Sequence, residues 1–162
     1  MKADLIYVGL VDAMAWDDVK YPKEVHTASD WNDMVADQKA LRVFSIAFMI
    51  DGGGSAITVG EKGHLRISVS CVIERATLLA DQVGSIKIDI WKDTYANFPP
   101  TNADTITGGN EPEIVAGQKD EDSTLTGWIK TINADDILAY NVDSCATIQR
   151  CVVMLKVRRS GV

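Results

Sequence analysis

Apolar and polar residues alternate with a period of two in several short stretches of the chain. Isoleucine occupies every second position in 86–91. In 65–71, apolar residues of several types likewise occupy every second position. Because successive side chains of a strand point to opposite faces, this pattern predicts strands with one face in a core. Glycines and polar turns bound the predicted strands 43–50, 64–70, 73–79, 85–91, 137–142 and 147–157, with weaker candidates near 57 and 128. The chain is therefore expected to be mainly β, an antiparallel β-sandwich or jelly roll.

One segment, at about residues 29–41, has the periodicity of a short helix. Thr27 or Ser29 can cap its first turn. Its apolar stripe, at spacings of three and four, is formed by Trp31, Met34, Val35 and Leu41. Such a stripe needs a partner. Either the helix closes one end of the β domain, or helices from several copies of the chain meet around a symmetry axis.

The pattern divides the chain into an N-terminal segment, 1–42, and a β domain, 43–162. The last predicted strand contains the run CVVMLKV, which is apolar at nearly consecutive positions. A strand buried on both faces would explain this run. The second face, which would include Val152 and Met154, could be covered by another subunit or by the N-terminal segment.

Composition narrows the class of protein. The 162 residues are 46% hydrophobic and include four tryptophans, which is enough for a sizeable core. The net charge of −7 argues against a nucleic-acid-binding protein. No apolar run reaches the roughly 18–20 residues of a membrane span, and acidic residues interrupt the apolar start of the chain, so a secretory signal is not expected.

The three cysteines, Cys71, Cys145 and Cys151, do not form the even set of a disulfide framework. Cys71 and Cys151 lie in alternating apolar runs, where a free thiol behaves as a small hydrophobic group. We therefore expect buried thiols and folding in a reducing cytoplasm.

No arrangement of residues in the sequence indicates catalysis or a cofactor. His26 and His64 have no companion at metal-ligand spacing, and His64 is expected to be an exposed edge residue. Ser55 lacks the glycines of a nucleophile elbow, and the glycines after Asp51 lack the lysine of a phosphate loop. We expect no enzyme activity, no metal and no cofactor.

An aromatic cluster follows the fourth predicted strand. It consists of Trp91, Tyr95 and Phe98, with Asn97 among the polar residues beside them. Aromatic rings with nearby polar groups could form a shelf that stacks on sugar rings, and Trp91, Tyr95, Asn97 and Phe98 are then the candidate glycan contacts. The same rings could instead close one end of the β core.

Several strings in the chain resemble a β domain that recurs in structural proteins of tailed bacteriophages. They are IDGGGSAIT, GEKGHLRISVSCVI, LLADQVGSIKIDIWKDTYANFPPT, DSTLTGW and DILAYNVDS, and the resemblance runs from about Phe44 to Arg158. WKDTYANFPPT and IDGGGSAIT are the most specific of them. The chain departs from the pattern at Cys151 and the CVVML run, where a more alternating, threonine-rich strand is expected.

The resemblance implies a jelly-roll-like knob, usually trimeric, that is displayed on a virion. The family supplies no catalytic residues. We therefore expect a non-enzymatic virion protein, either a short tail fibre or tail knob or a capsid decoration protein, assembled in the host cytoplasm. The expected partners are copies of itself, capsid or tail proteins and possible host glycans. The candidate assembly contacts are Trp31, Met34, Val35, Leu41, Val152 and Met154. A free carbohydrate-binding module is the alternative.

Overall fold

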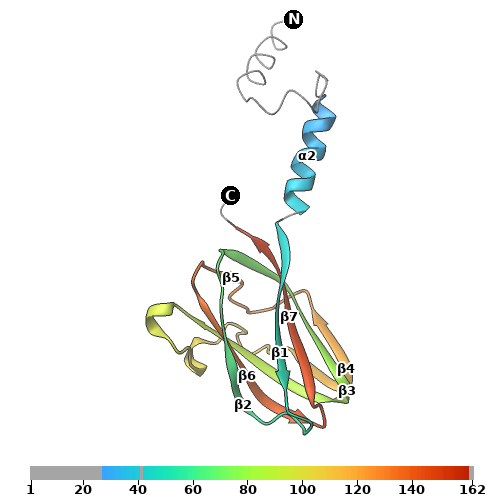
Figure 1. Cartoon of the computed structure of the whole chain (residues 1–162), viewed down its shortest axis with the longest axis vertical. Helices are drawn as coiled ribbons and strands as arrows, with labels where there is room; N and C mark the ends of the chain where they lie inside the picture. The colour runs from blue at the N-terminus through green and yellow to red at the C-terminus, as the bar shows by residue number, and fades with distance from the viewer. Residues whose placement is uncertain (1–26, 41, 161–162) are drawn as a thin grey trace, which may run out of the picture. The chain divides into compact units, whose positions relative to one another are not determined.

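The computed structural model describes residues 27–40 and 42–160. They form helix α2 (Ala28–Ala40), the short 3-10 helices η1 (Tyr95–Asn97) and η2 (Asn102–Asp104), and seven strands (Figure 1). The strands are β1 (Val43–Asp51), β2 (Gly60–Arg66), β3 (Cys71–Asp93), β4 (Glu113–Asp122), β5 (Thr131–Ile132), β6 (Ile137–Ala146) and β7 (Arg150–Arg159). The chain divides into two compact units, with the boundary between Gln38 and Lys39.

Helix α2 begins at the predicted cap. The amide and the hydroxyl of Thr27 donate to Asp30 Oδ2 over 2.5 and 2.8 Å, and the amide of Asp30 donates back to Thr27 Oγ1 over 3.3 Å. These bonds satisfy amides that the first helical turn leaves without partners. The prediction of a short helix near 29–41 is confirmed, although Leu41 lies outside the described residues.

The strands form one antiparallel sheet that is strongly curled. Its main path runs β1-β7-β3-β6-β2, and β4 and β5 also pair with β3. The long strand β3 holds the sheet together, because its first part pairs with β7 and its second part with β6. The predicted mainly β, antiparallel class with one short N-terminal helix is confirmed.

The core lies inside the curl. Alternate residues of β7, Cys151, Val153, Leu155 and Val157, are fully buried. Phe48 of β1 stacks on Tyr140 of β6 with ring centroids 4.3 Å apart, so the strand at one end of the sheet path meets the strand next to its other end across the core. Burial raises the pKa of the Tyr140 hydroxyl, which has no hydrogen-bond partner. The predicted burial of the free thiols of Cys71 and Cys151 is confirmed.

The strands predicted at 73–79 and 85–91 are one strand. Gly84, which was expected to mark a turn between them, lies inside β3 where another segment passes close by. A Cβ atom at this position would stand 2.5 Å from the carbonyl oxygen of Ala146 and 2.4 Å from Thr147 Oγ1. Glycine is therefore required for close approach of two backbones, and the chain does not reverse there.

Three other strand predictions need correction. β2 spans 60–66, earlier than the predicted 64–70, and the weaker candidates near 57 and 128 are not strands. Gly63 lies inside β2 at a φ of +144°, against the ring of Phe48. β4 was missed because its residues are mostly polar and exposed, with Ile114 its only buried side chain. The backbone pairing of β4 with β3, rather than apolar alternation, holds it in the sheet.

Candidate assembly surfaces and binding cleft

Helix α2 exposes the apolar side chains that the sequence placed on one stripe. Trp31, Met34 and Val35 are 43%, 47% and 46% exposed. They follow one another at helical spacing, so they present a narrow apolar seam. The structure thus places three of the candidate assembly residues on an exposed helix face.

Val152 and Met154 lie on the outer face of β7, opposite the core. Cross-strand pairing sets Met49, Val152 and Leu79 side by side in one row, and Ala47, Met154 and Thr77 in the next. We call the five apolar residues of these rows, Met49, Val152, Leu79, Ala47 and Met154, the apolar block. Thr77, whose hydroxyl donates to Glu121, borders it. β7 is therefore buried on its inner face and half-buried on its outer face. The prediction that both faces of this strand are fully buried is wrong for the outer face.

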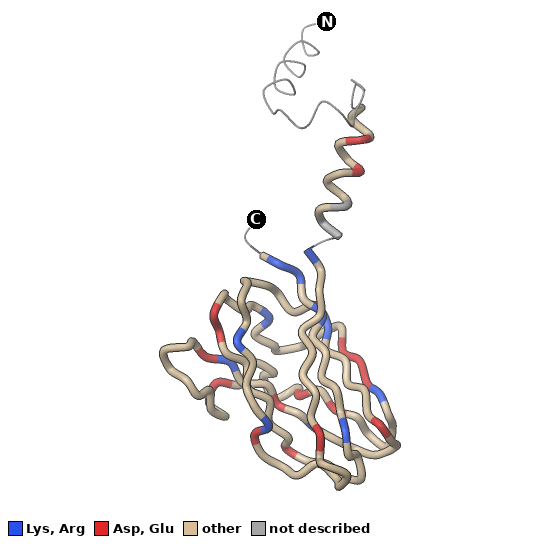
Figure 2. The backbone as a smooth tube through the Cα atoms, in the orientation of Figure 1, with Lys and Arg blue, Asp and Glu red and all other residues tan. Residues whose placement is uncertain are grey.

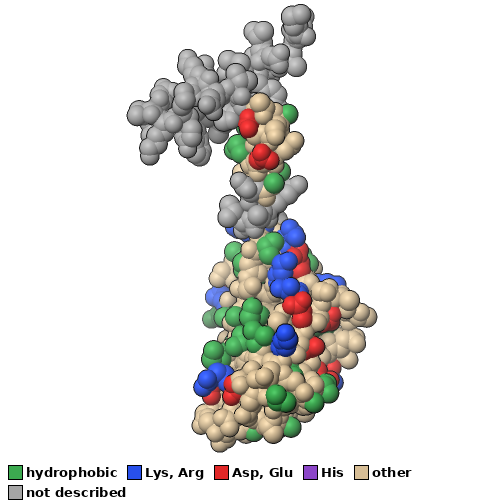
Figure 3. Space-filling view, turned by 90° about the vertical axis from the view of Figure 1, so that its right-hand side faces the viewer, with side chains coloured by type: hydrophobic (Ala, Val, Ile, Leu, Met, Phe, Trp, Pro, Cys, Tyr) green, Lys and Arg blue, Asp and Glu red, His purple; other side chains and the backbone are tan. Residues whose placement is uncertain are grey.

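Charged residues border the apolar block along the strand direction. Figure 2 shows basic residues gathered near the C-terminal end of β7, where Arg158 lies. On the side of the β domain that is turned toward the viewer in Figure 3, hydrophobic side chains gather beside a column of basic and acidic side chains. Strand pairing places Lys156 and Arg75 just beyond one end of the apolar block, and Asp51, Arg150 and Asp81 just beyond the other.

A shallow cleft lies at the opposite end of the sheet path, beside η1. His64 and Arg66 of β2 line it together with Tyr95, Phe98 and Ile137, and its volume is about 530 Å³. Tyr95 and Phe98 are 64% and 52% exposed. Two large ring surfaces are thus accessible in one depression.

Polar groups hold the cleft in shape. The guanidinium of Arg66 lies 4.7 Å from the centre of the Tyr95 ring and forms an ion pair with Asp135 at 2.9 Å. The ring of His64 meets the ring of Phe98 nearly edge-on, with centroids 4.8 Å apart. His64 Nε2 is also 3.1 Å from Glu61 Oε1, at an angle that makes no hydrogen bond. Aromatic faces beside polar groups suit a flat ligand with hydroxyls on its edge, such as a sugar.

Trp91 and Asn97, the other candidate glycan contacts, do not line this cleft. Trp91 Nε1 donates to Asp89 Oδ2 over 2.7 Å, and Asn97 Nδ2 donates to Asp93 Oδ1 over 3.1 Å. Both side chains therefore have partners that secure the segment after β3. The sequence missed His64 and Arg66 as cleft residues, because they lie about 30 positions before Tyr95 and only sheet pairing brings them near. His64 lies on the edge strand β2, as expected, but it is half-buried, so the expected exposure is wrong.

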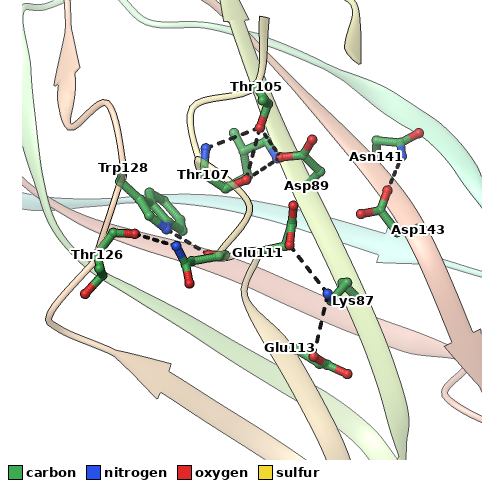
Figure 4. Close-up of polar contacts among 12 residues, drawn as sticks. Lys87, Asp89, Thr105, Thr107, Glu111, Glu113, Thr126, Trp128, Asn141 and Asp143 are labelled. Atoms are coloured by element: carbon green, nitrogen blue, oxygen red, sulfur yellow. Dashed lines mark hydrogen bonds and ion pairs between the residues drawn. The ribbon is translucent and has the colours of Figure 1, made fainter. Parts of the chain in front are cut away.

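The segment that carries Tyr95 and Phe98 is anchored at a buried carboxylate (Figure 4). Asp89 is 4% exposed and accepts hydrogen bonds from the amide of Ile90, Trp91 Nε1 and the hydroxyls of Thr105 and Thr107, all within 2.8 Å. A capping box between Thr101 and Asp104 shapes η2. The cleft is thus built on a fixed support.

Several carboxylates gather near Asp89 without forming a metal site. Lys87 Nζ lies 3.4 Å from Glu111 and 3.9 Å from Glu113. Burial, together with the charges of Asp89 and Glu111, raises the pKa of Asp143, while the Asn141 amide opposes the shift. Among the described residues, no group of three or more His, Cys, Asp or Glu side chains is placed to hold a metal ion.

The described part of the chain contains no helix that is long and apolar enough to cross a membrane. No protein-family model and no curated protein matches the chain. Among solved structures, the fold is similar to a chain of the structure titled "Capsid of Ralstonia phage GP4". The TM-score is 0.42 and the sequence identity 15%, over 74% of this chain and 86% of that chain. This likeness is weak.

Proposed function

We propose that this chain is a non-enzymatic structural protein of a bacteriophage virion. In this proposal, the segment that contains α2 assembles the chain, as a homotrimer, and attaches it to a capsid or tail protein. The β domain is displayed on the particle surface, as a short tail fibre or tail knob or as a capsid decoration. The sequence strings between Phe44 and Arg158 that resemble tailed-phage structural proteins support this class.

The observation that carries the proposal is the exposed apolar seam of α2. A helix of 13 residues is marginal in water unless it packs against something. Met34 and Val35 each leave nearly half of their surface exposed on this helix. Packing the seams of several copies together would bury these side chains and stabilise the helices at the same time.

The first test measures the mass of the full chain in solution. We expect a trimer for the native sequence, and a smaller species for Met34→Lys combined with Val35→Lys, because two charges would then lie in the seam. The matched control is Asn32→Lys combined with Ala36→Lys, which adds the same charge on another side of the helix. Assembly through α2 would be refuted if the Met34→Lys, Val35→Lys chain were still a trimer. It would also be refuted if the native chain were a monomer.

The second test asks whether residues 1–42 attach the chain to the particle. Virions are assembled with tagged copies of the full chain or of a chain that lacks 1–42, and the bound tag is quantified. We expect the truncated chain to fold, as judged by its β-type circular dichroism, and to be absent from purified virions. Retention of the folded truncated chain on virions would show that the anchor lies in the β domain.

A glycan-binding module is the second candidate function, and the exposed rings of Tyr95 and Phe98 in the cleft favour it. Stacking of a sugar on these rings predicts binding to bacterial surface oligosaccharides in a calorimetric titration. Phe98→Ala should abolish that binding. Ile129→Ala, at a residue that is 56% exposed outside the cleft, should leave it unchanged. Absence of binding across an oligosaccharide panel at millimolar concentration would remove this candidate.

A further inference from the structure

The cleft beside η1 has no excess of positive charge. Three segments form its surroundings, 60–66 of β2, 92–98 at the end of β3 and 135–137 at the start of β6. Their basic residues are Lys62, Arg66 and Lys92, and their acidic residues are Glu61, Asp93, Asp135 and Asp136. With His64 neutral, the acidic residues outnumber the basic ones.

The basic residues of these segments are also occupied within the chain. Arg66, which lines the cleft, contacts Asp135 through two nitrogens, Nε at 3.0 Å and Nη2 at 2.9 Å. Lys92 pairs with Asp136 at 3.2 Å, and Lys62 donates to Thr58 Oγ1 and to a backbone carbonyl. An acidic ligand would therefore meet one guanidinium that already has its carboxylate, so the cleft does not attract anions.

A cationic ligand is disfavoured for a different reason. The faces of aromatic rings attract cations, but the guanidinium of Arg66 already lies 4.7 Å from the centre of the Tyr95 ring. A ligand cation stacked on Tyr95 would lie beside this guanidinium and be repelled by it. The arrangement of charges thus favours a ligand that carries no charge.

The polar groups of the cleft can bind hydroxyls. Both contacts of Arg66 end on Asp135 Oδ1, and the two side chains are 51% and 62% exposed, so Arg66 Nη1 can donate to a ligand and Asp135 Oδ2 can accept from it. A hydroxyl both donates and accepts, and two neighbouring hydroxyls of a sugar match such an adjacent donor and acceptor. The exposed ring of Phe98 offers an apolar surface for the C–H face of the same sugar.

We propose that the cleft binds an uncharged sugar residue and discriminates against acidic and amino sugars. The sugar ring lies against Phe98 and Tyr95, and two of its neighbouring hydroxyls bond to Arg66 and Asp135. The volume of about 530 Å³ is in the range of small-molecule sites, roughly 300–1,000 Å³. The net charge of −7 acts in the same direction, because it repels acidic polysaccharides at long range. This inference rests on the second candidate function, glycan binding, and adds the charge of the ligand and its polar contacts.

Calorimetric titration of the full chain with matched oligosaccharides tests the discrimination. Each neutral oligosaccharide is compared with one in which a CH₂OH group is oxidised to a carboxylate, and with one in which an amine replaces a hydroxyl. We expect both charged forms to bind about tenfold more weakly than the neutral form, or weaker still, because like charges then meet. Binding of the neutral form should change less than about twofold between roughly 0.05 and 0.5 M salt, since salt screens only charge interactions.

Asp135→Asn tests the role of the carboxylate. Asparagine tolerates the φ of +72° at this position, so the variant should fold. Arg66 then loses its counter-charge, and the carboxylate form should bind about tenfold more tightly than it binds to the native chain. A variant that was merely less well folded would bind every form more weakly. The matched control, Asp120→Asn, removes the same charge from an exposed position of β4 and should change neither affinity.

The outcomes separate the inference from glycan binding itself. Tighter binding of the acidic or the amino form to the native chain would overturn the inference and leave glycan binding in place. An Asp135→Asn chain that binds the carboxylate form no better than the native chain would also overturn it, because Asp135 would then not set the preference. Absence of binding for every form would remove the second candidate function and the inference together.

Discussion

The two parts of strand β3 differ in what covers their outer side. At Asp89, in the second part, the segment that follows β3 folds back, and the hydroxyls of Thr105 and Thr107 donate hydrogen bonds to the Asp89 carboxylate, which also accepts one from Trp91 Nε1. At Thr77 and Leu79, in the first part, the outer side is exposed or half-exposed, and Leu79 belongs to the apolar block. One continuous strand is thus covered by its own chain along one part and left accessible along the other.

This difference between the two parts of β3 shows that side chains on its outer face have two different roles. Polar side chains on the covered part hold a loop in place, because a buried carboxylate needs donors that only the loop supplies. Apolar side chains on the accessible part have no such internal use. We therefore propose them as a contact surface for another molecule, and the following experiments test this division.

The largest effect should separate two adjacent residues of β3. Leu78 is fully buried and Leu79 is 43% exposed. Leu78→Ala should lower the free energy of unfolding by about 2–5 kcal/mol, because it leaves a cavity in the core. Leu79→Ala should cost less than about 1 kcal/mol. Urea denaturation of dilute protein measures both. An equal loss for Leu79→Ala at low concentration would mean that its side chain is buried within the chain.

Removing the anchor of the covered part should cost nearly as much. Asp89→Ala leaves the hydroxyls of Thr105 and Thr107 and the indole of Trp91 without their acceptor, so we expect a loss of roughly 2–4 kcal/mol. Trp91 fluorescence should shift at the same time. Asp93→Ala serves as the comparison, since Asp93 is half-buried and bonds only to Thr94 and Asn97. If the two variants lose equal stability, Asp89 does not anchor the segment.

The sequence predicted the elements whose alternation reflects a core on one side. β1 was found because apolar residues such as Ile46 and Phe48 recur at every second position, and β6 and β7 were found as largely apolar runs. β4 was missed because backbone pairing with β3 holds it in the sheet while its side chains face water. The continuity of β3 was missed because a glycine in the sequence, here Gly84, can mark either a turn or a place where two backbones pack closely. The neighbouring residues do not distinguish the two cases.

The candidate sites were predictable only in part. Exposed aromatic residues after β3 pointed to Tyr95 and Phe98, but the partners His64 and Arg66 depend on long-range strand pairing that no local spacing reveals. Val152 and Met154 were found as a consecutive apolar run. Their neighbours Met49 and Leu79 could be joined to them only once the register of three strands was known.

A smaller effect distinguishes two of the three thiols. Burial raises the pKa of Cys151 to about 12, and its thiol should react with a thiol reagent only when the protein unfolds. Cys151→Ser should cost about 1–2 kcal/mol, because a hydroxyl is harder to bury than a thiol. Cys145 is half-buried, so Cys145→Ser should cost less than about 0.5 kcal/mol. Rapid labelling of Cys151 in the native protein would contradict its position on the inner face of β7.

The smallest effect concerns Asp143, beside the covered part of β3. Its folded-state pKa is raised by partial desolvation and by the charges of Asp89 and Glu111, so the folded protein holds its proton more tightly than the unfolded chain. The ionised carboxylate therefore disfavours the folded state above this pKa, and the penalty is relieved as the pH falls toward the ordinary value of 3.8. Asp143→Asn should raise stability at neutral pH by a few tenths of a kcal/mol, a small gain because the side chain is exposed to solvent.

Asp104 provides a control of opposite sign for this prediction. Hydrogen bonds from the amide and hydroxyl of Thr101 lower the pKa of Asp104, so its carboxylate stabilises the fold above pH 3.8, and this stabilisation is lost as the pH falls through the lowered value. Asp104→Asn should therefore reduce stability at neutral pH, whereas Asp143→Asn should increase it. Thermal unfolding of both variants between pH 3 and 7 measures the two slopes. If both variants change stability in the same direction at neutral pH, the carboxylate of Asp143 is not the one that the charges of Asp89 and Glu111 disfavour.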